Sequence, residues 1–139
     1  MKSVFFYGLF MDEDLLMEKG LNPANSGLAR VTGYGLRIGT RATLEASAGE
    51  RVFGSVMDLS ERELASLYGE ESVADYVPKH LLAFDMQGNP REVISYILPM
   101  EKLSGRNREY ARLLALAARK IGLPDDYIDE IETWSKGSA

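Results

Sequence analysis

Two adjacent carboxylates, Glu70 and Glu71, are the residues of this chain best suited to acid–base chemistry. They follow a predicted helix that ends at Gly69, so they meet the negative end of the helix dipole, where acidic side chains are disfavoured. Desolvation at such a place would raise a carboxyl pKa towards the range that is useful for proton transfer. A solvated acidic turn explains the same pattern, and chemistry alone favours this simpler interpretation.

Other kinds of catalytic site are limited by residue counts. The chain has no cysteine, which excludes disulfides, thiolate metal sites and cysteine nucleophiles. Its one histidine, His80, lies in a segment typical of a strand, where a surface or partly buried role is expected rather than a catalytic one. A histidine-rich zinc site cannot be built from one residue. An enzyme with this sequence would therefore use a carboxylate as its acid–base group.

A second candidate site is the segment Tyr7-Gly8-Leu9-Phe10, which follows the first predicted strand. Gly8 permits a tight turn and the close approach of a ligand. Consecutive backbone N–H groups after it can form an anion-binding nest. The alternative is an ordinary strand-to-helix turn with Leu9 and Phe10 in the core.

Charge and hydropathy restrict the partners. The net charge is −5 and the basic residues are scattered, so no nucleic-acid partner is expected. No apolar run approaches the length of a membrane span, and a cytoplasmic protein without membrane partners is expected.

Arg37 and Arg41 are four residues apart, which along a strand places them on one face. There they suit either the binding of a substrate carboxylate or an ordinary surface position.

These residues must be positioned by a small α+β framework. The length of 139 residues and the 45% apolar content fit one domain over residues 1–139. Glycines inside the strand patterns predict a strongly curved sheet or small barrel with helices packed around it. Strands are predicted over 2–7, 28–44, 51–59, 76–84 and 91–98. Helices are predicted over 13–19, 61–68 and 106–121, and a last helix is capped by Asp125 or Asp126. A loop is predicted over 21–27, a turn over 47–50, and a frayed tail over 136–139. A capping box, Ser60 with Glu63, opens the helix over 61–68.

Several stretches in this order resemble the γ-glutamylcyclotransferase-like family over nearly the whole chain. They are Phe5-Phe6-Tyr7-Gly8, Leu36-Arg37-Ile38-Gly39, Val52-Phe53-Gly54-Ser55-Val56, residues 64–71 followed by Tyr76-Val77, and residues 122–127. The resemblance implies a small mixed β-barrel with helices on its outside. It also implies an enzyme without cofactor or metal, in which the α-amino group of a γ-glutamyl substrate attacks its own γ-carbonyl and releases 5-oxoproline and an amine.

The resemblance also implies roles for individual residues. Glu71 corresponds to the catalytic glutamate, which moves protons from the α-ammonium to the departing amine. Glu70 is the rival, because a shift of one residue would exchange the two. The backbone of Tyr7-Gly8-Leu9-Phe10 would hold the glutamyl carboxylate or carbonyl oxygen. Tyr76 would line the pocket, and Arg41 is the arginine we expect to bind the substrate carboxylate.

Three positions depart from the family pattern. Leu9 replaces the serine that follows Tyr-Gly, Ser72 replaces the glycine after the glutamate, and Tyr68 replaces an acidic residue. These changes keep open a catalytically silent protein that binds a small carboxylate ligand or a protein partner, and a different reaction on the same fold. An apolar patch near Leu9, Phe10 and Met11 suits either a homodimer contact or a hydrophobic substrate tail.

Overall fold

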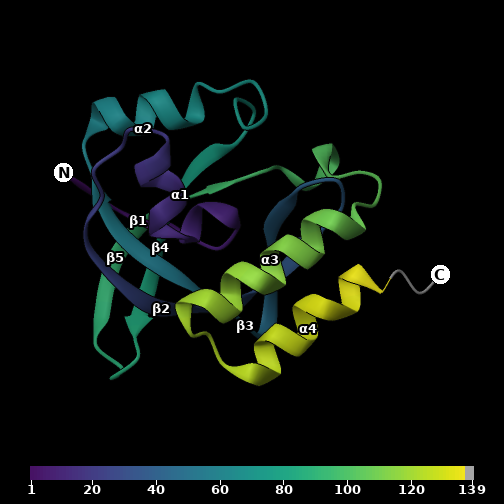
Figure 1. Cartoon of the computed structure of the whole chain (residues 1–139). Helices are drawn as coiled ribbons and strands as arrows, with labels where there is room; N and C mark the ends of the chain where they lie inside the picture. The colour runs from purple at the N-terminus through teal and green to yellow at the C-terminus, as the bar shows by residue number, and fades with distance from the viewer. Residues whose placement is uncertain (137–139) are drawn as a thin grey trace.

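A closed five-stranded barrel forms the centre of the computed structural model, which describes residues 1–136 (Figure 1). Its strands are β1 (Lys2–Phe6), β2 (Ala24–Ile38), β3 (Ala42–Leu59), β4 (Val77–Asp85) and β5 (Pro90–Ile97). Around the barrel they follow the order β1-β3-β2-β4-β5. The pair β1 and β5 is parallel and every other pair is antiparallel, so the predicted mixed barrel is confirmed.

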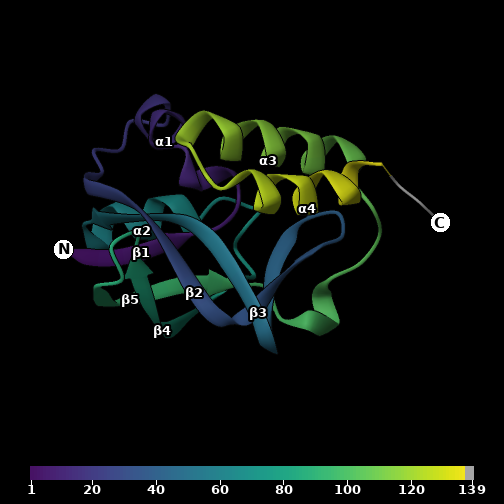
Figure 2. The same cartoon turned by 90° about the horizontal axis from the view of Figure 1, so that it is seen from below.

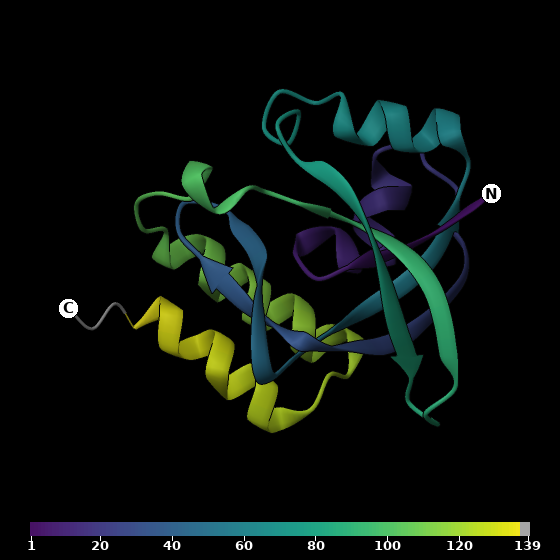
Figure 3. The ribbon, with the colours of Figure 1, turned by 180° about the vertical axis from the view of Figure 1, so that it is seen from behind.

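The helices lie on the outside of this barrel, as predicted. The α-helices are α1 (Glu13–Glu18), α2 (Glu61–Tyr68), α3 (Arg108–Ile121) and α4 (Asp125–Ser135), and two short 3-10 helices are η1 (Leu9–Met11) and η2 (Met100–Lys102). Figure 2 shows α3 and α4 side by side over β2 and β3. From behind, in Figure 3, α2 lies at the other end of the molecule from α4. No helix within residues 1–136 is long and apolar enough to cross a membrane.

One hydrophobic cluster joins the barrel to its helices. Leu64 and Leu67 of α2 and Leu114 of α3 are buried in it together with residues of every strand. The capping box of Ser60 and Glu63 opens α2 as predicted, with the Glu63 N–H donating to Ser60 at 3.1 Å. The amphipathic spacing in the sequence therefore places these helices correctly, because each buries one apolar face on the barrel.

Gly54 brings β3 unusually close to β1. A Cβ atom at this position would lie 2.1 Å from the backbone oxygen of Phe6, a distance that real Cβ atoms do not tolerate. The glycine inside the strand is thus explained by a close backbone approach. Since Tyr7 follows Phe6 directly, this contact also sets where the segment after β1 begins.

Two boundary predictions are wrong. The segment 47–50 is not a turn between strands: Tyr34 pairs with Ala46 and Thr32 pairs with Arg51, so these residues form an irregularity within β3 opposite Gly33. The loop 21–27 ends early, because β2 begins at Ala24. Long-range strand pairing, which polar local sequence does not reveal, decides both cases.

The prediction that Arg37 and Arg41 share a strand face is also wrong. The strand β2 ends at Ile38, and Arg41 lies in the turn before β3. Side-chain alternation applies only along a continuous strand, so it stops before Arg41. Arg37 instead pairs with Glu45 and Glu50.

The C-terminal helices begin slightly away from the predicted positions. Asn107 caps α3, which starts at Arg108, and Gly122 ends it with a φ of 87° as expected of a glycine stop. Pro124 takes the capping position of α4, so Asp125 and Asp126 occupy its first turn rather than its cap. Of the predicted tail, residues 137–139 lie outside the described residues.

Candidate functional site

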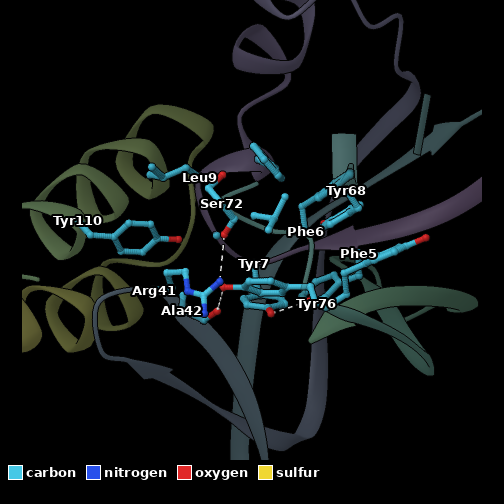
Figure 4. A pocket seen from close by; sticks show the side chains of 14 residues that line it. Phe5, Phe6, Tyr7, Leu9, Arg41, Ala42, Tyr68, Ser72, Tyr76 and Tyr110 are labelled. Carbon is cyan, nitrogen blue, oxygen red and sulfur yellow. Dashed lines mark hydrogen bonds between the residues drawn. The ribbon is translucent and has the colours of Figure 1, made fainter. Parts of the chain in front are cut away.

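A cavity of about 270 Å³ lies where the end of β1 faces the connection between α2 and β4 (Figure 4). Its lining consists of Phe5, Phe6, Tyr7, Gly8, Leu9, Phe10, Arg41, Ala42, Tyr68, Ser72, Val73, Tyr76, Tyr96 and Tyr110. Six of the seven predicted site residues are in this lining, and the seventh, Glu71, is not. We call Tyr7–Phe10 the first wall, and Ser72–Tyr76 with Arg41 the second wall.

The first wall is anchored in the core. The Tyr7 side chain is 6% exposed, and its hydroxyl donates to the backbone oxygen of Tyr96 at 2.7 Å. Burial raises the pKa of Tyr7 well above its ordinary value. Met11 is 1% exposed, so the expected surface patch is reduced to Leu9 and Phe10, which face the cavity.

Tyr110 of α3 closes the cavity beside the first wall. Its hydroxyl lies 2.8 Å from the place where a Cβ of residue 8 would be, so a side chain at position 8 would force Tyr110 to move. Burial raises the pKa of Tyr110 to about 12, and the nearby backbone N–H of Leu9 acts in the opposite direction. Sequence reasoning missed this residue, because its place in the apolar face of a helix indicates only packing.

The second wall is held by an ion pair. Arg41 donates from two nitrogens to the carboxylate of Asp75, at 2.7 and 3.0 Å, and also to the backbone oxygen of Ser72 at 3.0 Å. The hydrogen bonds from Arg41 lower the pKa of Asp75 below its usual range. The Tyr76 hydroxyl donates to the Ala42 backbone oxygen at 2.5 Å. Arg41 and Tyr76 therefore line the cavity as predicted, in a segment tied back to the barrel.

Four rings form what we call the aromatic end of the cavity: Phe6, Phe10, Tyr68 and Tyr96. The rings of Tyr68 and Tyr96 are stacked with centroids 3.8 Å apart, and Phe10 meets Tyr68 edge-on at 6.0 Å. Burial raises the pKa of Tyr68 far above its usual value. In Figure 4, Tyr68 and Phe6 lie on the side of the cavity away from Arg41 and Tyr110. Tyr68, which replaces an acidic residue of the family pattern, thus contributes an aromatic ring and no charge to the cavity lining.

The neighbouring carboxylates Glu70 and Glu71 have different environments. Glu70 accepts two hydrogen bonds from Lys19, at 3.0 and 3.1 Å. Glu71 is exposed in the turn that the Val73 N–H closes on the Glu70 oxygen. Within residues 1–136 Glu71 has no hydrogen bond or ion pair, and it directly precedes Ser72 of the second wall. Glu71 is therefore next to a lining residue in the chain, but it is exposed and is not part of the lining.

Two further observations concern His80 and possible metal ligands. His80 is exposed on β4, as expected of a surface strand histidine. Within residues 1–136, no group of three or more histidine, cysteine, aspartate or glutamate side chains is arranged to hold a metal ion.

The cavity occurs in a chain that matches a known family model. The AIG2-like family model matches residues 51–131, which is more than half of the chain. A search of functionally curated proteins finds no significant match. The matched segment contains the second half of β3, α2, the turn with Glu71, and most of the C-terminal helices.

Solved structures show that the fold is shared with cyclotransferases. A protein described as a gamma-glutamyl cyclotransferase is 20% identical, with a TM-score of 0.80 over 94% of this chain and 86% of that one. A human protein described as uncharacterized is 21% identical, with a TM-score of 0.79 and the same coverage. A yeast protein described as a glutathione-specific gamma-glutamyl cyclotransferase is 12% identical, with a TM-score of 0.59 over 97% of both chains. At these identities the likeness concerns the fold.

Proposed function

The chain belongs to the AIG2-like family and has the γ-glutamylcyclotransferase-like fold, and from this premise we propose that it cyclises γ-glutamyl amides. The substrate's α-nitrogen attacks its γ-carbonyl carbon, one N–C bond forms, the amide C–N bond breaks, and 5-oxoproline and a free amine leave. The α-ammonium gives up two protons and the departing nitrogen gains two, so neither water nor a redox partner is consumed. The protein must therefore hold the chain curled and move protons.

The observation that carries the proposal is that the three carboxylates of residues 70–75 differ in whether they have a partner. Glu70 forms an ion pair with Lys19, and Asp75 forms one with Arg41. Glu71 is the carboxylate of this turn that has no partner within residues 1–136. A general base must be able to release and accept a proton, which an engaged carboxylate does poorly. This supports Glu71 over Glu70 as the acid–base residue.

The substrate would lie between the two walls. The N–H groups of the first wall suit the γ-carbonyl oxygen or the α-carboxylate. Arg41 retains N–H donors beyond those bound to Asp75 and Ser72 and suits the α-carboxylate. The exposed Glu71 side chain would turn across Ser72 towards the α-nitrogen.

The test is 5-oxoproline release from a panel of γ-glutamyl amides by the wild type, Glu71→Gln and Glu70→Gln. We expect Glu71→Gln to lose about 10²- to 10⁴-fold in kcat, the usual contribution of general acid–base catalysis. Glu70→Gln is the matched control, since it removes the neighbouring charge and should keep most of the activity. Equal activity of Glu71→Gln and the wild type would exclude Glu71 as the base.

A second candidate is a catalytically silent protein that binds a small carboxylate ligand. The observation that favours it is the lining, in which none of the fourteen residues carries a carboxylate and Leu9 stands in place of a hydroxyl residue. It predicts that 5-oxoproline or a γ-glutamyl amide binds in calorimetry while the wild type releases no product. Turnover by the wild type would reject it.

A further inference from the structure

The charge of the cavity restricts the part of the substrate that leaves. Arg41 is the one charged side chain in the described lining, and Asp75 already pairs with it. A γ-glutamyl substrate brings one α-carboxylate, which the spare donors of Arg41 and the first-wall N–H groups can meet. If the departing amine were an amino acid, it would bring a second carboxylate. That charge would find no cation in the lining, and burying an unpaired charge is costly.

A cation on the rim of the aromatic end does not change this balance. The Lys19 nitrogen lies 5.7 Å from the centroid of the Phe10 ring, on the rim of the aromatic end. It is already bound by both oxygens of Glu70. A ligand carboxylate would therefore have to compete with Glu70 for it at a partly exposed position.

The aromatic end of the cavity favours apolar groups over charged ones. The stacked rings of Tyr68 and Tyr96 and the edge of Phe10 present apolar surface. In Figure 4, Tyr68 lies on the side of the cavity away from Arg41. Such rings bind aromatic or branched apolar groups through area burial and ring–ring contacts. The volume of about 270 Å³ lies just under the range of about 300–1,000 Å³ that is common for ligand sites. The occupant is therefore small.

We infer that the departing half of the substrate is a small apolar amine that carries no charged group other than its amino group. The substrates are then γ-glutamyl amides of aromatic or short alkyl amines rather than γ-glutamyl dipeptides. This inference rests on the proposed function. It is based on two observations: at one end of the cavity Arg41 is already paired with Asp75, and at the other end there are four aromatic rings. It makes the aromatic end the specificity-determining part of the cavity.

The test uses substrate pairs that differ by a single carboxylate. One pair is γ-glutamyl-phenethylamine and γ-glutamyl-phenylalanine, and the other is γ-glutamyl-ethylamine and γ-glutamyl-alanine. We expect kcat/KM for the amine member of each pair to be about tenfold or more above that for its dipeptide, the ratio that a difference of about 1.4 kcal/mol produces. Equal values, or a preference for the dipeptides, would overturn the inference while leaving the cyclotransferase proposal intact.

Binding separates failure of the inference from failure of the activity. The same pairs are titrated calorimetrically into Glu71→Gln, which retains the cavity. Tighter binding of the amine members without turnover by the wild type would support the inference and reject the proposed reaction. Absence of both binding and turnover would reject both.

A variant that adds a cation to the aromatic end completes the test. Phe10→Arg places a guanidinium on the rim of that end, at a partly exposed position that tolerates a longer side chain. We expect the ratio between amine and dipeptide to fall several-fold, mainly through a lower KM for the dipeptide. Phe10→Leu is the matched control, because it removes the ring without adding charge and should leave the amine member preferred. An unchanged ratio in Phe10→Arg would contradict the charge argument.

Discussion

The two walls of the cavity are built in different ways. The first wall continues a buried strand, and its Tyr7 is bonded to the barrel while Gly8 lies against Tyr110. The second wall belongs to a surface connection, held by the ion pair of Arg41 with Asp75. The first wall is therefore part of the core, whereas the segment carrying Glu71 is held by surface interactions. If substrate binding requires a movement, we expect it in the second wall, because its contacts lie nearer the surface.

The largest expected effect comes from disturbing the strand that leads into the first wall. In Gly54→Ala the new Cβ meets the Phe6 backbone oxygen, which cannot move without shifting β1. We expect the free energy of unfolding to fall by about 3 kcal/mol, together with ligand binding. Gly27→Ala in β2 is the control, since no atom lies within 4 Å of its Cβ position. Denaturant unfolding measures both, and similar midpoints would show that the first wall is less rigid than we describe.

A smaller effect is expected at the contact between the first wall and α3. Gly8→Ala brings a Cβ to within 2.8 Å of the Tyr110 hydroxyl, the movable end of a side chain. We expect a loss of about 1–2 kcal/mol, much of it recovered in the double variant Gly8→Ala/Tyr110→Phe, which removes the clashing atom. A double-mutant cycle in urea measures the coupling. Strictly additive losses would mean that Tyr110 does not constrain Gly8.

The smallest effect is expected at the second wall and depends on pH. The pKa of Asp75 is lowered in the folded state by Arg41, so its stabilisation is complete above the ordinary aspartate pKa of about 3.9 and is lost as the pH falls through the lower folded value. Asp75→Asn should therefore be slightly less stable than the wild type at neutral pH. Below about pH 4 the two melting temperatures should converge. Parallel curves over the whole range would show that the ion pair does not stabilise this wall.

Local sequence signals accounted for much of the framework. The capping box at Ser60, the glycine stop at Gly122 and the helical spacing of apolar residues placed the α-helices to within about two residues. The run that ends at Tyr7-Gly8 identified the first wall. Each of these signals depends on neighbouring residues in the chain, which is why it could be interpreted before the tertiary structure was seen.

Other features depend on residues that are distant in the chain. The irregularity at 47–50 follows from the register of β3 on β2, and the stack of Tyr68 on Tyr96 joins residues from α2 and β5. The difference between Glu70 and Glu71 was likewise invisible, because Lys19, from the end of α1, selects one of two identical side chains. Residue types and local spacing therefore predicted the candidate segments and the fold class. Only tertiary packing decided which side chains share the cavity, because that depends on contacts between elements that local sequence does not encode.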